Sequence, residues 1–482
     1  MKKIIKVSLL LFILLALWHS FRQFSVMKLD GDIAESVLPY AGVQKTFDDP
    51  TGIKTIINND PHSGPNRFFS HYFLHKTFRE IPLLLQNFCD PIESVYYTAA
   101  IAKLAMLIML VFLLAVIITG GCRIASLKFL ITTIILLPLP HGIGIIDKSV
   151  SYSFFYAFPL VFLLLYYIPI FFNLLHDKTI KMNWILIVLW SIFAVISCFS
   201  GPLNSPVILI TNAILFFYLF HQHWQTNNDK SLYQKTLHAI KTIRRRYYLF
   251  LIPISVIALY STFLGTYTNV YPDLQSSVKN LYLLLPEGIW KILTTTGSYS
   301  IMLLLLILNY FMVILPYKNE PQSKKILGLY RFLIAFSSFY ILLLPFGGYR
   351  PYRPLLLRHD TILPVTILLI ITVVYTFLFV LKHLKTEKRH YYLKPVYLAI
   401  VLLFFIFFAG RNMVRTFNDC EKSSLYAISQ SKEDVVVLYN DCSVIGWEPV
   451  YQPEETKNYA ELMYLWNMTN RVKLYYNAPQ TN

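Results

Sequence analysis

Runs of hydrophobic residues, separated by short polar segments, recur along the chain from Ile4 to Gly410. Many of these runs reach the roughly 20 residues that an α-helix needs to cross the hydrocarbon core of a bilayer. The pattern predicts an all-α polytopic membrane protein with eleven transmembrane helices. The expected spans are Ile4–Ser20, Val95–Gly120, Phe129–Pro140, Phe154–Leu175, Trp184–Phe199, Pro206–Phe220, Tyr247–Leu264, Tyr299–Leu315, Ile326–Pro345, Thr361–Leu381 and Pro395–Gly410.

The composition agrees with this pattern, because 56% of the 482 residues are apolar and only 14% are charged. In a soluble globular domain, about a quarter of the residues are charged. The mean hydropathy is +0.51. These values exclude a soluble multidomain enzyme, a disordered chain and a fibrous protein.

The net charge of +17 follows the expected topology. With the N-terminus in the cytoplasm, the cytoplasmic segments hold 21 of the 43 lysine and arginine residues and four acidic residues, whereas the short outer loops hold six basic residues. This is the positive-inside distribution of a protein in the inner (plasma) membrane, so we expect membrane lipids and no nucleic acid as partners. The expected spans contain no acidic residue. Lys103, about two turns into its span, is expected to snorkel towards the membrane surface.

Two long polar segments are expected on the non-cytoplasmic side, a first periplasmic loop at 21–94 and a C-terminal tail at 411–482. We therefore divide the chain into a membrane domain at 1–410, which includes this loop, and a small periplasmic or extracellular domain at 411–482. The apolar stretch after the 'MKK' start is interpreted as an uncleaved anchor rather than a signal peptide, since Trp18, His19 and Phe21 are too bulky for a good cleavage site.

The tail has the pattern of a compact strand–helix–strand unit in the stretches 'EDVVVLYN', 'AELMYLWNM' and 'RVKLYY'. Cys420 and Cys442 both lie in this tail, on the side of the membrane where oxidation is allowed. They could form a disulfide, and the alternative is two free thiols. Cys89 also lies outside, whereas Cys122 and Cys198 fall at or in spans.

An amphipathic helix is expected in the first loop, at 'NRFFSHYFLHKTFREIPLLLQNF'. Its apolar residues step by four and three, as in a helix that lies at the membrane interface with one face in lipid, and Pro82 would kink or divide it. His71 and His75 have the i, i+4 spacing of a metal pair, but no third ligand is evident, and we interpret them as polar residues at the headgroup surface. The apolar stripe consists of Leu74, Phe78, Ile81, Leu85 and Phe88.

A cluster of acidic residues follows the first span by about ten residues and consists of Asp30, Asp32 and Glu35. The D-x-D spacing can aim two carboxylates at one point, where they can share a divalent cation or divide the roles of acid and base. The alternative is helix capping, with Asp32 as the N-cap and Glu35 as the third residue of a capping box. We select these three residues as candidate catalytic residues, with Asp30 and Asp32 as the ligands of any metal.

Three arginines stand in a short outer loop before the tenth expected span, against the positive-inside trend. They are Arg350, Arg353 and Arg358, and His359 and Asp360 follow directly. The guanidinium fork suits phosphate oxygens, because it donates two parallel hydrogen bonds. The alternatives are anchoring to anionic lipid headgroups and pairing with the acidic first loop. We predict that the three arginines and His359 bind a donor phosphate, and that Asp360 orients Arg358 or His359.

Together, these features resemble the GT-C superfamily of multi-pass membrane glycosyltransferases. The resemblance lies in the cytoplasmic N-terminus, the long first outer loop with carboxylates just after the first span, and the late-loop segment 'RHDTILP' from Arg358 to Pro364. It implies transfer of a sugar from a polyprenyl-phosphate donor to a glycan or lipid acceptor by an inverting mechanism. Asp30 or Asp32 matches the catalytic acidic position, and Arg358 matches the contact to the carrier phosphate. His359 stands where many members have tyrosine.

Two other functions stay open from the sequence. A glycan polymerase or ligase with a pyrophosphate-linked donor would use the arginines and would need no carboxylate base. A transporter or flippase of lipid-linked saccharides would move its substrate unchanged, although the absence of acidic residues from the spans disfavours coupling to protons or cations.

Overall fold

The computed structural model describes residues 2–146, 148–179, 183–224, 232–243, 245–268, 278–295, 297–317, 319–347, 355–384, 393–411 and 417–478. The chain divides into two compact units. Unit 1 comprises Met1–Asp49, Phe68–Val161 and Val396–Asn482, and unit 2 comprises Pro50–Arg67 and Phe162–Pro395. The tail therefore groups with the first loop and the first helices, whereas the sequence suggested a boundary near residue 410.

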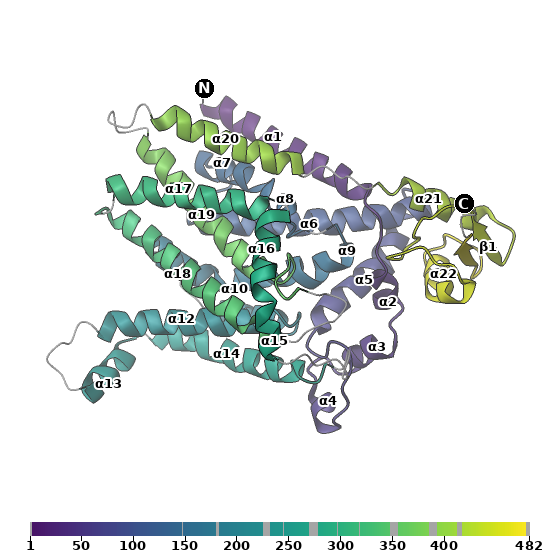
Figure 1. The fold of residues 1–482 in the computed structure, drawn as a ribbon, viewed down its shortest axis with the longest axis horizontal. Coiled ribbons are helices and arrows are strands. Elements are labelled where there is room, and N and C mark those ends of the chain that lie inside the picture. The colour runs from purple at the N-terminus through teal and green to yellow at the C-terminus, as the bar shows by residue number, and fades with distance from the viewer. Residues whose placement is uncertain are drawn as a thin grey trace. The chain divides into compact units, whose positions relative to one another are not determined.

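Unit 1 is built of helices and one small sheet (Figure 1). Its elements are α1 (Lys2–Ser25), α2 (Asp32–Val37), α3 (Ala41–Asp48), α5 (Phe68–Leu85), α6 (Pro91–Thr119), α7 (Leu127–Leu136), α8 (Leu139–Gly142), α9 (Val150–Tyr152), the π-helix η1 (Ser153–Ala157), most of α20 (Leu393–Arg411), α21 (Asp419–Gln430), β1 (Val435–Leu438), the 3₁₀ helix η5 (Pro453–Thr456), α22 (Lys457–Leu465) and β2 (Leu474–Asn477).

The elements of unit 2 among its described residues are all helices. The helix α10 begins in unit 1 and continues into unit 2. The elements of unit 2 are α4 (Ile53–Ile57), α10 (Phe158–His176), α11 (Trp184–Cys198), α12 (Asn204–Trp224), α13 (Leu232–Thr242), α14 (Arg245–Gly265), α15 (Val278–Leu283), α16 (Leu285–Thr295), α17 (Ser298–Tyr317), α18 (Pro321–Leu343), η3 (Leu344–Gly347) and α19 (Leu363–Leu384).

Seven helical segments among the described residues are long and apolar enough to cross a membrane, and an eighth would be a pair bent by 86°. The chain is therefore a helical, membrane-embedded protein. Every expected span falls on a helical segment, but the segments near 127–142, 184–198 and 395–411 are shorter than a full span, so the count of eleven stays a prediction. The seven are Lys3–Ser25, Pro91–Thr119, Val150–His176, Asn204–Trp224, Tyr247–Gly265, Pro321–Gly347 and Leu363–His383.

The helix predicted in the first loop is confirmed as α5, which continues through Pro82 without a break. Its apolar face packs against protein, because α5 contacts α2 and α6 and both Leu74 and Phe78 are fully buried. At the end of the predicted stripe, Phe88 is 88% exposed. The first part of the stripe therefore contributes to the core of unit 1 instead of facing lipid.

The tail contains the predicted strand–helix–strand unit, with α22 between two parallel strands. Figure 1 shows its elements together beyond one end of α6, which α21 contacts. The disulfide between Cys420 and Cys442 is formed, with a Cα–Cα distance of 6.0 Å. Trp466 anchors the unit to the first loop, because its indole N–H donates a 2.7 Å hydrogen bond to the backbone carbonyl of Phe78.

Candidate functional site

Asp30 is 2% exposed, and both of its carboxylate oxygens accept hydrogen bonds. One oxygen accepts from the Ser149 hydroxyl at 3.0 Å, the Val150 N–H at 2.7 Å and the Ser151 N–H at 3.1 Å, and the other accepts from the Ser151 hydroxyl. These donors lie at the first turn of the long helix Val150–His176. An anion at a helix N-terminus satisfies backbone N–H groups that have no partner within the helix and is stabilised by the helix dipole. Asp30 therefore caps a membrane helix.

Lys103 binds the backbone of Lys148, two residues before this helix begins. Its ammonium donates to the backbone carbonyl of Lys148 and lies 3.2 Å from the sulfur of Met27 and 6.0 Å from the ring centroid of Phe24. The side chain is completely buried. The expected snorkelling is therefore wrong, because Lys103 turns into the protein and binds backbone there.

Asp32, at the start of α2, is half-buried and faces the tail. Its carboxylate accepts a 3.2 Å hydrogen bond from the indole N–H of Trp447. The glycine of the Asp-Gly-Asp turn permits this contact, because a Cβ on Gly31 would lie 2.8 Å from the Trp447 ring. The two aspartates thus turn to different partners, Asp30 to the start of a membrane helix and Asp32 to the tail.

Glu35 and Tyr459 also lie near Asp32. Glu35 is exposed as a whole, but partial burial of its carboxyl group and, to a lesser extent, the negative charge of Asp32 raise its pKa above the ordinary value. Burial also raises the pKa of Tyr459, with smaller contributions from the charges of Glu35 and Asp32. Glu35 makes no capping hydrogen bond in α2, and the N-cap position is Gly31 rather than Asp32. The alternative of a capping box is therefore wrong.

The described part of the chain contains no group of three or more His, Cys, Asp and Glu side chains suited to a metal ion. His75 Nδ1 lies 3.0 Å from the carbonyl oxygen of Ser36, and the ring of His71 lies 4.9 Å from that of Phe155. Burial lowers the pKa of His75, so its neutral form is favoured. The two histidines therefore contact different residues, His75 the backbone of Ser36 and His71 the ring of Phe155.

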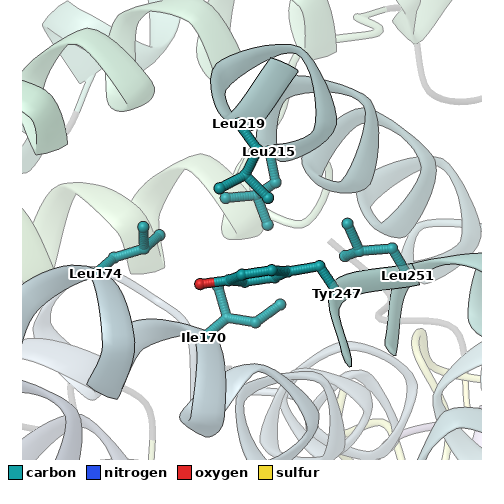
Figure 2. A pocket seen from close by; sticks show the side chains of 6 residues that line it. All are labelled: Ile170, Leu174, Leu215, Leu219, Tyr247 and Leu251. Atoms are coloured by element: carbon teal, nitrogen blue, oxygen red, sulfur yellow. The ribbon is translucent and has the colours of Figure 1, made fainter. Parts of the chain in front are cut away.

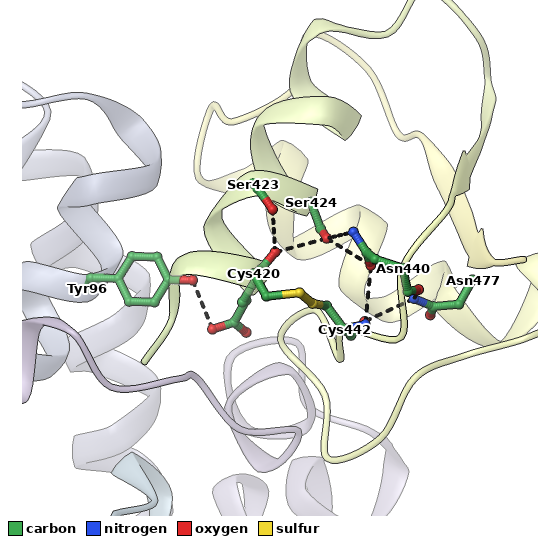
Figure 3. The surroundings of a disulfide bond; sticks show 8 residues. Tyr96, Cys420, Ser423, Ser424, Asn440, Cys442 and Asn477 are labelled. Carbon is green, nitrogen blue, oxygen red and sulfur yellow. Dashed lines mark hydrogen bonds between the residues drawn. A yellow bond between two sulfur atoms is a disulfide. The ribbon is translucent and has the colours of Figure 1, made fainter. Parts of the chain in front are cut away.

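Glu421 is a buried carboxylate that the sequence pattern did not reveal. It is 0% exposed and accepts hydrogen bonds from the Leu29 N–H at 3.0 Å, the Tyr96 hydroxyl at 2.9 Å and the Ile445 N–H at 2.9 Å. Figure 3 shows Tyr96 directed at this carboxylate, beside the disulfide of Cys420. Burial raises its pKa to about 7, although the three hydrogen bonds act in the opposite direction. This carboxylate joins the tail, the first loop and α6.

The late loop of unit 2 is described from residue 355 onward, so Arg350 and Arg353 lie outside the described residues. Arg358 donates through Nε and Nη2 to the two carboxylate oxygens of Asp360, at 3.1 and 3.0 Å, and through Nη1 to the carbonyl of Leu355. Asp360 therefore orients Arg358, as predicted. The ring of His359 lies 5.8 Å from that of Tyr299.

A small hollow in unit 2 has an apolar lining and lies between α10, α12 and α14 (Figure 2). The single polar side chain in the lining is Tyr247, whose hydroxyl donates to Asn173. The other lining residues are apolar, so we do not select this hollow as the candidate site. Its lining consists of Ile170, Leu174, Leu215, Leu219, Tyr247 and Leu251.

Three residues near the acidic cluster in unit 1 were not predicted from the sequence, namely Trp447, Tyr459 and Glu421. A weak signal for Trp447 is present in 'SVIGWEP', where an aromatic residue follows glycine in a polar loop. No spacing rule links it to Asp32, 415 residues away. No protein-family model, curated protein or solved structure matches the chain.

Proposed function

We propose that this chain is an integral membrane glycosyltransferase with a GT-C-like, eleven-span architecture and a cytoplasmic N-terminus. It moves a sugar from a polyprenyl-phosphate donor to a glycan or lipid acceptor on the periplasmic face. The observation that carries the proposal is the pair Asp32 and Glu35, two carboxyl groups at the surface of the first loop just after α1, beside aromatic side chains. Asp30, the other candidate, is occupied in capping a membrane helix.

Asp32 is the better base of the two aspartates, because it is half-buried whereas Asp30 is enclosed. In the proposed step, the acceptor oxygen bonds to the anomeric carbon while its proton passes to the Asp32 carboxylate. The bond between that carbon and the phosphate oxygen breaks, and polyprenyl phosphate leaves with the electron pair. The raised pKa of Glu35 lets it keep a proton at a higher pH than an ordinary glutamate, which separates the roles of the two carboxyl groups.

The carrier phosphate is assigned to the late loop, to Arg350, Arg353, Arg358 and His359. Arg358 supports this assignment in part, because Asp360 fixes its fork while a guanidinium has five N–H donors and three are used in hydrogen bonds to described residues. A pre-oriented guanidinium loses less entropy when it binds an anion.

The test is incubation of the purified protein with a panel of radiolabelled polyprenyl-phosphate sugars, with and without EDTA. We expect release of the labelled sugar to water or to an added glycan acceptor, and the EDTA arm decides whether a divalent cation takes part. If every monophosphate donor stays intact although it binds, the proposal fails. Pyrophosphate-linked donors and flipping in vesicles then test the polymerase or ligase and the transporter.

A further inference from the structure

The indole of Trp447 is in direct contact with the Asp-Gly-Asp turn. Its N–H donates to Asp32, and its ring lies against Gly31 and 5.6 Å from the ring of Tyr152. The residue is 52% exposed, so one side of the indole remains at the surface. Trp447 therefore bridges the proposed base and the start of a membrane helix, although it belongs to the tail.

The loop 442–447, here named the Trp447 loop, is held at several points. Cys442 is bonded to Cys420, the Tyr475 hydroxyl donates to the carbonyl of Val444 at 2.8 Å, and the Ile445 N–H donates to Glu421. Ile445 has φ +53°, in the left-handed region that a β-branched residue rarely adopts. Such a conformation persists only where the surrounding structure over-determines it.

Glu421 ties this loop to the chain just before the acidic turn. One of its oxygens accepts from Ile445 of the Trp447 loop, and the other accepts from the backbone N–H of Leu29, the residue next to Asp30. The Trp447 loop thus meets the acidic turn at two places, through Glu421 at Leu29 and through Trp447 at Asp32. Two attachments separated by three residues fix both the position and the direction of the turn.

We propose that Trp447 is a positioning residue for Asp32, and that Glu421 and the Cys420–Cys442 disulfide hold Trp447 in place for this task. The inference rests on the proposed function, in which Asp32 is the base. A hydrogen bond donated to the carboxylate fixes its rotamer and stabilises the charged form that a base requires. The tail then serves the reaction by fixing a catalytic group in the first loop.

The first test replaces Trp447 by phenylalanine, which keeps an aromatic ring and removes the N–H. We expect kcat to fall about 10- to 100-fold, as for other misplaced catalytic groups, with the donor KM unchanged. The acidic limb of the pH–kcat profile should move to higher pH, because the charged carboxylate has lost a donor. Trp184→Phe is the matched control, at a tryptophan in α11 that is 73% exposed, and should leave both quantities unchanged.

The second test does not need turnover. Hydrogen exchange is measured in the full-length protein for Cys420→Ser and Glu421→Gln against the wild type. We expect faster exchange both in the Trp447 loop and at residues 28–37, with α19 unchanged. If exchange at 28–37 stays as in the wild type while the Trp447 loop opens, the tail does not hold the acidic turn and the inference is wrong.

Failure of the proposed function and failure of this inference give different results. A wild-type protein that leaves every donor intact removes the proposed function and, with it, the catalytic part of this inference. A wild-type protein that turns over donor while Trp447→Phe matches it in kcat and in pH profile removes the inference alone.

Discussion

Asp30 and Glu421 are buried and accept four and three hydrogen bonds, whereas in the same part of unit 1 Asp32 is half-buried and Glu35 is exposed. All four are carboxylic acids on segments that sequence alone describes as polar. The buried pair joins distant segments and leaves no oxygen without a donor. In the other pair, Asp32 accepts a hydrogen bond from the Trp447 indole, and both carboxyl groups influence the pKa of Tyr459.

The hydrogen-bond donors around a carboxyl group, rather than its spacing in the sequence, decide whether the group stabilises the fold or is accessible to a substrate. A carboxyl group enclosed by donors from distant segments joins those segments and is closed to an acceptor hydroxyl. A carboxylate at the surface contributes little to stability, so it can serve chemistry without a large cost to folding.

Substitution of Asp30 should have the largest effect on the stability of the fold. Asp30→Ala leaves two backbone N–H groups and two serine hydroxyls without their buried acceptor, and we expect unfolding to become easier by about 3–5 kcal/mol. Asp32→Ala is the matched control and should cost about 1 kcal/mol or less. Thermal unfolding of the two variants in the same detergent measures the difference. Equal losses of stability would contradict the separation into buried and surface carboxylates.

The disulfide should have the next largest effect. It joins residues 22 positions apart, and loss of such a cross-link costs about 3 kcal/mol. We expect Cys420→Ser to make the tail susceptible to limited proteolysis near the Trp447 loop. Cys89→Ser, at a free cysteine of the first loop, is the control and should be cleaved as the wild type is. A resistant tail in both variants would show that the other contacts suffice.

The raised pKa of Glu421 predicts that the stability of the folded protein falls as the pH rises. Its pKa in the folded protein is raised to about 7 from an ordinary value of 4.5, so the folded state holds this proton more tightly than the unfolded state. Its contribution to stability is complete below about pH 4.5 and is lost as the pH rises through 7, on the order of 3 kcal/mol. Melting temperatures at pH 5 and pH 8 should differ more in the wild type than in Glu421→Gln. The same difference in both proteins would contradict this assignment.

Arg358 should give the smallest effect on stability. Arg358→Lys replaces a two-point pair with Asp360 by a single contact, and the arginine side chain is 27% exposed, so we expect a loss of about 1 kcal/mol or less. Binding of a labelled polyprenyl-phosphate donor should weaken more than the melting temperature suggests. Unchanged donor binding would remove Arg358 from the proposed phosphate site.

Much of the fold was predictable, because hydrophobic length and turn residues act locally. Every expected span falls on a helical segment, and the strand–helix–strand tail is confirmed. The structure decides the alternative that the sequence left open for Cys420 and Cys442, because the two form a disulfide. Individual contacts were not predictable, because they join residues far apart in sequence. Asp30 meets its donors about 120 residues away, and Leu29 meets Glu421 392 residues away.

The candidate site shows the same limit. The acidic cluster was identified by its spacing, but the different environments of Asp30 and Asp32 depend on Ser149 and Trp447, which no local pattern connects to them. Lys103 was expected to reach the membrane surface, but it turns inward and donates a hydrogen bond to the carbonyl of Lys148, just before α9. Local patterns therefore identify candidate residues, whereas tertiary contacts assign their roles.

The most direct measurement is the turnover of a polyprenyl-phosphate sugar by Asp32→Asn compared with the wild type, in protein whose melting temperature is unchanged. General base catalysis contributes roughly 10²- to 10⁴-fold in rate, and we predict a loss of kcat in this range. Asp32→Asn protein that is folded and transfers sugar at the wild-type rate would contradict the assignment of Asp32 as the base.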